Sequence, residues 1–207
     1  MKIIKPTFVI ESPIDGNQIL QQIERAGRTA YKSEDKITPT SALTFAKMIT
    51  QSGHFSVIEH YSVTVRVICD RGVSHEIVRH RLATYTQEST RYCNYTKGKF
   101  DAEIAVIAPC FWDAGDERYT VWKQAMTQCE QAYQQLIAMG ATPQEARSVL
   151  PNSLKTEMVM TMNLREWRVF FTMRTAAAAH PQMREIAQPL LREFRQRIPI
   201  IFDDITY

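Results

Sequence analysis

The sequence has few glycines, no closely spaced pair of cysteines and no long apolar run. Its 207 residues include 7 Gly and 4 Cys, and no Cys-x-x-Cys pair occurs among Cys69, Cys93, Cys110 and Cys129. This spacing indicates neither a zinc ribbon nor a disulfide framework, so we expect reduced thiols in a cytoplasmic protein. No apolar run approaches the roughly 18 residues that a membrane span needs, and the N-terminus does not resemble a signal peptide.

The scarcity of glycine also limits how a phosphate could be bound. The chain has no Gly-x-Gly-x-x-Gly motif, and its dispersed glycines cannot form a conventional phosphate loop. The histidines do not follow a His-Glu-x-x-His or His-x-x-Glu-His spacing, so no metal site is predicted. A phosphate-bearing ligand would therefore have to be held by cationic side chains.

Positive charge is concentrated as arginine. The formal net charge is only +3, which argues against a general nucleic-acid-binding protein. Residues 164–197 nevertheless contain seven Arg, three Glu and no Lys, and a second cluster lies at Arg71, Arg79, Arg81 and Arg91. Arginine without lysine favours bidentate recognition of phosphate or carboxylate groups.

Hydrophobic periodicity predicts a mixture of strands and helices. Strict alternation predicts strands over residues 61–69 and 154–162, and a β-branched start predicts another over residues 2–10. Helices are expected after Asp15, which can cap the first, and then over residues 40–53, 112–139, 142–150, 164–175 and 181–197. In the second helix Leu43, Phe45, Ala46 and Ile49 are expected to point inward. The helix over residues 112–139 has one apolar stripe, expected to serve packing or subunit contact, formed by Trp122, Met126, Cys129, Tyr133 and Leu136. For the next helix, Thr142-Pro143-Gln144-Glu145 supplies a capping box, with a proline at N1 and an acidic first turn.

These elements, without a linker or repeat, indicate one domain. We expect an α/β fold of the α+β type, with a central, mostly antiparallel sheet packed with helices, over residues 1–207.

A short helix is expected after Arg71, and its length decides whether Arg81 is buried or exposed. Val73, Ile77, Val78 and Leu82 recur at helical spacing, and Arg81 would then project into the same apolar sector. An arginine on a buried face needs an anionic partner. Alternatively, the helix ends by residue 80 and Arg81 is exposed. Helix geometry alone does not decide between the two.

Residues 79–91 carry an unusual density of anion-binding side chains. Arg79-His80-Arg81 is followed, after seven residues, by Ser89 and then Arg91. The hydroxyls of Thr84, Tyr85, Thr86 and Thr90 add further donors, which suits a ligand with several phosphates or two phosphorylated ligands. The alternative is a solvated loop with surface ion pairs to Glu76 and Glu88.

This run resembles the hallmark of the flavin-dependent thymidylate synthases, which is Arg-His-Arg, seven residues, then Ser. Similar blocks occur in the family order at residues 54–60, 146–151, 163–165 and 171–174. Several separated blocks are much harder to meet by chance than one tripeptide.

The resemblance implies a homotetramer that carries FAD, builds its active sites across subunit contacts, and makes dTMP from dUMP. Methylenetetrahydrofolate would donate the carbon and NADPH would reduce the flavin. The implied flavin-binding residues are Ser56, Arg79, His80, Arg81, Gln87, Asn163, Leu164 and Arg165. The implied nucleotide-binding residues are Glu76, Ile77, Val78, Arg79, Gln87, Glu88, Ser89, Thr90, Arg91, Arg147 and Arg174.

Arg174 is the catalytic residue that the resemblance implies. It corresponds to the family arginine beside the uracil, where a fixed cation favours ionisation at N3. Two positions depart from some relatives: Glu76 replaces a Gln, and Val169 replaces an Asn or His that faces the flavin.

The sequence gives weaker support to other functions. Pro109-Cys110 is superficially similar to the nucleophile of the unrelated folate-only thymidylate synthases, but their other motifs are missing, so Cys110 is expected to be a packing residue. Ser89 has no neighbouring base and is expected to donate a hydrogen bond. An enzyme of the same architecture could act on UMP or deliver a hydroxymethyl group. A non-enzymatic nucleic-acid-binding protein is disfavoured by the modest net charge.

Overall fold

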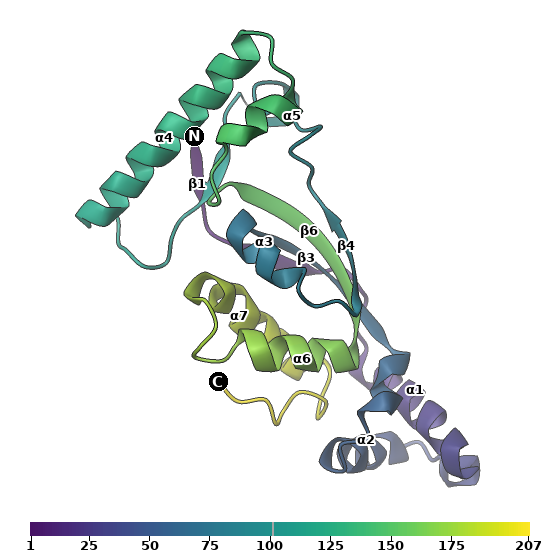
Figure 1. Ribbon diagram of the computed structural model, residues 1–207. Helices are drawn as coiled ribbons and strands as arrows, with labels where there is room; N and C mark the ends of the chain where they lie inside the picture. Colours follow the sequence, from purple (N-terminus) through teal and green to yellow (C-terminus); the bar gives the residue numbers. More distant parts are fainter. Residues whose placement is uncertain (101) are drawn as a thin grey trace. The chain divides into compact units, whose positions relative to one another are not determined.

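The computed structural model describes residues 1–100 and 102–207, which form an α+β fold (Figure 1). A four-stranded antiparallel sheet has the order β2 (Thr7–Ile10), β3 (Ser62–Asp70), β6 (Lys155–Asn163), β4 (Ala83–Gln87). A second sheet pairs β1 (Lys2–Ile4) in parallel with β5 (Ala105–Ile107). The helices are α1 (Gly16–Arg28), α2 (Ser41–Gln51), α3 (Arg71–Ile77), α4 (Glu117–Ala138), α5 (Pro143–Ala146), α6 (Leu164–Arg174) and α7 (Pro181–Arg197). The expected fold class, a mostly antiparallel sheet packed with helices, is confirmed.

The chain divides into two compact units whose boundaries cross β2, β3, β4 and β6. The first unit contains Met1–Thr7, Val67–Arg79 and Thr86–Val159, and the second contains Phe8–Arg66, His80–Tyr85 and Met160–Tyr207. The single domain expected from the sequence stays a prediction.

An aromatic cluster forms the core of the second unit. Helices α6 and α7 lie side by side (Figure 1), and their fully buried rings contact one another in stacked, tilted and edge-to-face pairs. Phe171 lies at the centre, with ring centroids 5.4 Å from Trp167 and 5.0 Å from Phe194. Trp167 also donates its indole N–H to the backbone oxygen of Val63 on β3, 3.1 Å away. The helix pair is thereby attached to the sheet through both apolar and polar contacts.

The predicted alternation of the two long strands is confirmed. On β3, Val63 and Val65 are fully buried, and on β6, Met160 and Met162 are buried in the same manner. The residues between them are partly exposed, as expected for strands with one covered face.

Helices α1 and α2 of the second unit pack against each other. Asp15 caps α1 as predicted, accepting a hydrogen bond from the N–H of Gln18. A side chain at Gly27 would lie only 2.5 Å from the ring of Phe45, so glycine permits the close approach of the two helices. Phe45 is buried, but Leu43 is 51% exposed, and its predicted inward position is wrong. Two residues correspond to about 200° of helix, so Leu43 faces away from Phe45.

Helix α4 packs on the core of the first unit. Of its predicted stripe, Met126 and Tyr133 are buried, whereas the remaining members are half-buried. The helix begins at Glu117, five residues after the predicted start, because the Asp116 carboxylate accepts from the N–H of Arg118 and caps it. The next helix, α5, begins with the predicted capping box, which Thr142 and Glu145 form.

Two further predictions about strands need correction. The expected strand over residues 2–10 is two strands in different sheets, separated at Pro6, which has no N–H for a ladder. Strand β4 was not predicted, because its Thr-rich sequence has no apolar alternation. In the described part of the chain, no helix is both long and apolar enough to cross a membrane.

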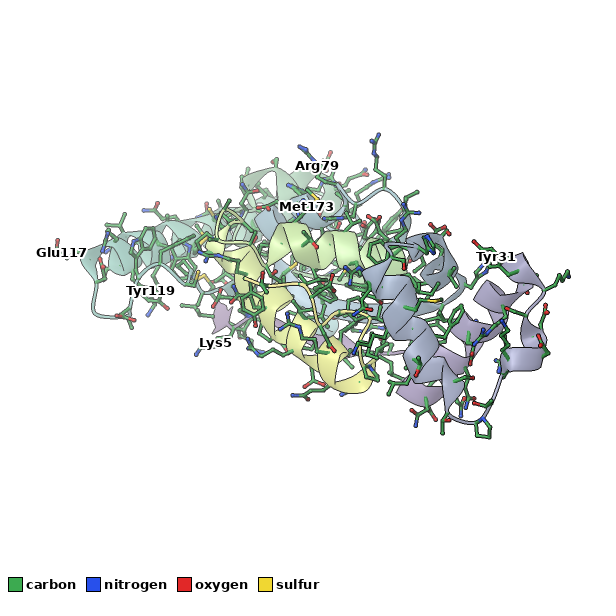
Figure 2. All side chains as sticks on the ribbon, turned by 90° about the horizontal axis from the view of Figure 1, so that it is seen from below. Lys5, Tyr31, Arg79, Glu117, Tyr119 and Met173 are labelled. Atoms are coloured by element: carbon green, nitrogen blue, oxygen red, sulfur yellow. The ribbon has the colours of Figure 1, made fainter. Side chains whose placement is uncertain are left out.

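Replacing Phe171 by Ala is expected to destabilise the protein by about 3–5 kcal/mol, because the cavity would lie at the centre of the aromatic cluster. The measurement is urea unfolding followed by tryptophan fluorescence. Met173→Ala is the matched control on the same helix: this residue, labelled in Figure 2, is 54% exposed, and its loss should change stability by less than about 0.5 kcal/mol. Equal effects of the two substitutions would contradict the packing described.

Candidate active site

The site residues expected from the sequence fall into both compact units, and the boundary separates Arg79 from His80 within the Arg-His-Arg motif. The second unit holds Ser56, His80, Arg81, Asn163, Leu164, Arg165 and Arg174. The first unit holds Glu76, Ile77, Val78, Arg79, Gln87, Glu88, Ser89, Thr90, Arg91 and Arg147.

His80 is the most enclosed polar residue of the motif, with 4% of its surface exposed. Its Nδ1 lies 3.2 Å from Oε1 of Glu166, and its Nε2 lies 3.0 Å from Nε of Arg174, which donates to it. Its ring packs edge-on against Phe170, with 5.1 Å between the ring centroids. These three partners recur every four residues on α6, so one face of this helix surrounds the imidazole.

The enclosure changes the acid–base properties of the groups around the ring. Burial, together with the nearby Arg174 cation, lowers the pKa of His80 to about 4. A carboxylate favours a charged imidazole, but burial and Arg174 outweigh Glu166 here, so His80 is neutral at pH 7. Burial raises the pKa of Glu166 and raises the pKa of Tyr85 to about 12. The Tyr85 hydroxyl donates to the backbone oxygen of His80 at 2.7 Å.

The structure answers the question left open for Arg81. Helix α3 ends at Ile77, and Arg81 is exposed rather than on a buried helix face. The predicted apolar face is correct for Val73 and Ile77, which are buried. It is wrong for Val78 and Leu82, which are 39% and 73% exposed because they follow the helix.

The start of α6 carries the other expected flavin-binding residues. Asn163 caps the helix, since its Oδ1 accepts from the N–H of Glu166 at 2.8 Å. Leu164 is fully buried and its N–H donates to the backbone oxygen of Tyr61, so its side chain serves packing. Arg165 is exposed and pairs with Glu59 at 2.6 Å. Ser56 lies on an exposed position of the 3-10 helix Phe55–His60.

The expected nucleotide-binding residues of the first unit include three exposed guanidinium groups, on Arg79, Arg91 and Arg147. Figure 2 shows the Arg79 side chain extending from the chain after α3. Arg147 Nη1 donates to Thr90 Oγ1 at 3.4 Å, and the N–H of Arg91 donates to Ser89 Oγ at 3.3 Å. This arrangement combines cations with hydroxyls, the groups that bind a phosphate.

The remaining members of this group are held by protein contacts. Gln87 Nε2 donates to Ser74 Oγ and Thr156 Oγ1, at 2.9 and 3.1 Å. The half-buried Glu88 carboxylate accepts from Lys155 at 2.7 Å and from the Tyr95 hydroxyl at 3.0 Å. The ion pair of Glu88 is therefore made with a lysine of β6 rather than with an arginine of the motif. Ile77 is fully buried, Val78 is exposed and Glu76 is half-buried on α3.

The side chains of the second unit fit a flavin dinucleotide. Arg165, Val169 and Met173 recur every four residues on the exposed face of α6, and the neighbouring Arg81 and Leu82 are also exposed. Guanidinium groups suit a pyrophosphate, and exposed apolar side chains suit an aromatic ring system. At Val169 this face offers an apolar contact in place of the polar one found in some relatives.

Two further observations concern the cysteines and the groups that could ligate a metal ion. Cys110 is exposed, so its expected packing role is wrong; β5 ends at Ile107, and the apolar pattern does not extend to residue 110. Among residues 1–100 and 102–207, no three His, Cys, Asp or Glu side chains are grouped so that they could hold a metal ion.

Sequence reasoning missed three residues that contact expected site residues of their own unit, namely Glu166 in the second unit and Lys155 and Tyr95 in the first. The eight-residue spacing of Glu166 and Arg174 could have placed both on one helix face. Nothing local could have indicated His80, which lies 86 residues from Glu166.

Comparisons with known proteins agree with the motif. A family model described as thymidylate synthase complementing protein (Thy1) matches residues 14–200. A flavin-dependent thymidylate synthase of Geobacter sulfurreducens is 34% identical over 86% of this chain and 78% of its own length. One from Pyrococcus furiosus is 33% identical over 83% of this chain and 70% of its own length.

The fold is also similar to that of a solved structure, a UMP/dUMP methylase PolB from Streptomyces cacaoi bound with 5-Br dUMP. The TM-score is 0.79 at 20% identity, covering 98% of this chain and 96% of the other. The same enzyme bound with 5-Br UMP gives a TM-score of 0.76 at 19% identity, covering 98% and 95%.

The chain therefore belongs to the Thy1 family, the family of the flavin-dependent thymidylate synthases, and the resemblance noted from its motifs is confirmed. Members of this family are FAD-dependent, and this protein is a methyltransferase of the family that acts on nucleotides.

His80 is expected to titrate at about pH 4, far below the ordinary imidazole value of 6.5. The unfolded chain takes up a proton at this residue near pH 6.5 while the folded protein does not. The contribution of His80 to stability is therefore complete above pH 6.5 and is lost as the pH falls toward 4. Because Glu166, with its raised pKa, acts in the opposite direction, the direct measurement is an NMR titration of the His80 ring, assigned with His80→Asn. A midpoint of 6 or above would contradict the enclosure described.

Proposed function

We propose that this enzyme converts dUMP to dTMP, with FAD as cofactor, 5,10-methylenetetrahydrofolate as the carbon donor and NADPH as the reductant. The observation that carries the proposal is the placement of Arg174, whose guanidinium group is hydrogen-bonded to a buried, neutral His80. Support also comes from the relatives named flavin-dependent thymidylate synthase, which span most of this chain.

Arg174 would act on the uracil ring. A guanidinium group keeps its charge at any physiological pH and, beside N3, it would favour loss of the N3 proton. The negative charge is shared by N3, O2 and O4, so the C4 carbonyl withdraws less electron density from C5, and this carbon becomes nucleophilic without a bond to an enzyme thiol. The hydrogen bond to His80 restricts the orientation of the guanidinium group, as this role requires.

The nucleotide phosphate would be bound by side chains of the first unit. Arg79, Arg91 and Arg147 are exposed and can form bidentate contacts with phosphate oxygens. Ser89 would donate a hydrogen bond. Gln87, Glu88 and Thr90 would support this segment, together with backbone groups of residues 76–78.

In the second unit, Arg81 and Arg165 would bind the pyrophosphate of FAD. The other flavin-binding groups of this unit would be the side chains of Ser56 and Asn163 and the backbone at Leu164. Bound FAD supplies hydride transfer, which amino acid side chains cannot provide. Because His80 is enclosed by α6, its part in flavin binding would be to hold the Arg-His-Arg segment against this helix.

Two further parts of the proposal concern the setting of the reaction. We expect a homotetramer whose active sites include residues of more than one subunit. The cytoplasmic location expected from the sequence stays a prediction.

A second candidate is methylation of UMP by the same residues. It is favoured by the similarity of the fold to a methylase that is described as acting on UMP and dUMP. Glu76, where some relatives have Gln, adds to this possibility, because a carboxylate is an acceptor that can bind sugar hydroxyls. Transfer of a hydroxymethyl group is a third outcome, which the product mass separates from both.

The purified protein is expected to be yellow, with the absorbance of bound FAD. Supplied anaerobically with methylenetetrahydrofolate, NADPH and either dUMP or UMP, it should convert dUMP to a product heavier by one methylene group, as measured by mass spectrometry. Turnover of UMP in preference to dUMP would replace the first candidate by the second. A flavin-bound protein that leaves both nucleotides unchanged would refute the proposed function.

Arg174→Ala is expected to reduce turnover by about 10²–10³-fold, because the cation that stabilises the developing charge is lost, while FAD stays bound. Arg197→Ala is the matched control, since Arg197 forms an exposed ion pair with Glu193 on α7. The measurements are kcat with dUMP and the flavin content of each variant. Loss of flavin from Arg174→Ala, with nucleotide binding retained, would assign Arg174 to the cofactor instead.

A further inference from the structure

One face of α6 carries Glu166, Phe170 and Arg174, and all three contact the ring of His80. Glu166 is 7% exposed and His80 is 4% exposed, so both polar groups of this pair are buried. Buried polar atoms require hydrogen-bond partners, because water cannot replace a lost contact. The positions of the protons in this cluster are thus limited by the few atoms present.

The proton positions follow from the donors. Arg174 Nε carries one hydrogen and donates it to His80 Nε2, so Nε2 must present a lone pair. A neutral imidazole has its single proton on the other nitrogen, Nδ1. That nitrogen lies 3.2 Å from Glu166 Oε1, which accepts it. A continuous chain of hydrogen bonds therefore runs from Arg174 through the imidazole to Glu166.

We propose that Glu166 is a positioning residue for Arg174. By accepting the Nδ1 proton, Glu166 holds His80 in the tautomer whose Nε2 accepts from the guanidinium group of Arg174. In the other tautomer, an N–H would face the N–H of Arg174, and the two donors would repel each other. The effect of Glu166 on turnover rests on the function proposed above for Arg174, whereas its effect on the tautomer does not.

The other groups around His80 do not replace Glu166 in this role. The Tyr85 hydroxyl, which comes from β4, donates to the backbone oxygen of His80 rather than to its ring. Phe170 is apolar. Protonation of His80 would place a second cation against Arg174, and the lowered pKa of His80 disfavours it.

The position of Glu166 is itself determined by the start of the helix. Its backbone N–H is capped by Asn163 Oδ1 at 2.8 Å, so Asn163 determines where α6 begins. Arg174 follows two full turns later on the same face. The Asn163 block and the Arg174 block of the motif are thereby connected through one rigid helix and one imidazole.

The first experiment measures the tautomer directly by ¹⁵N NMR of the histidine-labelled holoenzyme at pH 7, with the His80 signal assigned by its loss in His80→Asn. Protonated and unprotonated ring nitrogens differ widely in chemical shift. We expect a protonated Nδ1 and an unprotonated Nε2 in the unmodified protein. In Glu166→Leu the buried Nδ1–H loses its acceptor, so we expect the proton to move to Nε2 and the Arg174 guanidinium group to turn away from the ring. Glu166→Gln keeps an acceptor oxygen and should keep the original tautomer.

The second experiment measures kcat and KM for dUMP and the flavin content of the same variants. Glu166→Leu should lower kcat by about 10–100-fold, with KM changed by less than about threefold and FAD retained, because only the orientation of Arg174 is lost. Glu166→Gln should retain most of the turnover. Glu193→Leu removes an exposed carboxylate of α7 and is the matched control; it should leave both the tautomer and kcat unchanged.

Three results would overturn the proposal. One is a proton on Nε2 in the unmodified protein, which can be measured even if Glu166→Leu does not fold. Another is an unchanged kcat per bound flavin in Glu166→Leu despite a changed tautomer. The third is loss of turnover in Glu166→Gln with the tautomer retained. An unmodified enzyme that does not methylate dUMP would refute the proposed function instead, and the tautomer measurement would still be valid.

Discussion

The hydrogen bond between Arg174 and a buried, neutral His80 is the interaction on which the polar part of the second unit depends. A guanidinium group at the end of a helix has many possible orientations, and one acceptor on a rigid ring selects among them. The ring is held in turn by a carboxylate, an aromatic edge and a tyrosine hydroxyl on its backbone. Four contacts on a single histidine thus convert a flexible cation into a directed one.

Three faces of helix α6 lie in three different environments. Trp167 and Phe171 point into the aromatic core, Glu166, Phe170 and Arg174 surround His80, and Arg165, Val169 and Met173 are exposed. Each set recurs every four residues, close to one helical turn, and Phe170 joins the first two sets because its ring also contacts Trp167 and Phe171. The stability of the core and the geometry of the polar cluster therefore depend on the same helix and on the capping residue that starts it.

Predictions from the sequence were reliable where a pattern was strictly periodic. The alternation of β3 and β6, the Asp15 cap and the capping box at Thr142 are local, and the structure contains each. Leu43 was misplaced because it faces away from Phe45 on the same helix, and Leu82 and Cys110 were misplaced because each follows the end of a periodic segment. The motif indicated which residues form the candidate site. Its decisive contact, between His80 and Glu166, joins residues 86 positions apart and depends on the tertiary fold.

The order of the four-stranded sheet has a consequence for association between copies of the chain. The two nine-residue strands, β3 and β6, are in the middle, while the outer strands β2 and β4 have four and five residues. The longest rows of backbone donors and acceptors are thus paired on both sides, and little edge remains for another strand to extend. Continuation of this sheet from one copy of the chain to the next is therefore disfavoured, and side-chain surfaces, whose complementarity restricts which partners fit, are the alternative means of assembly.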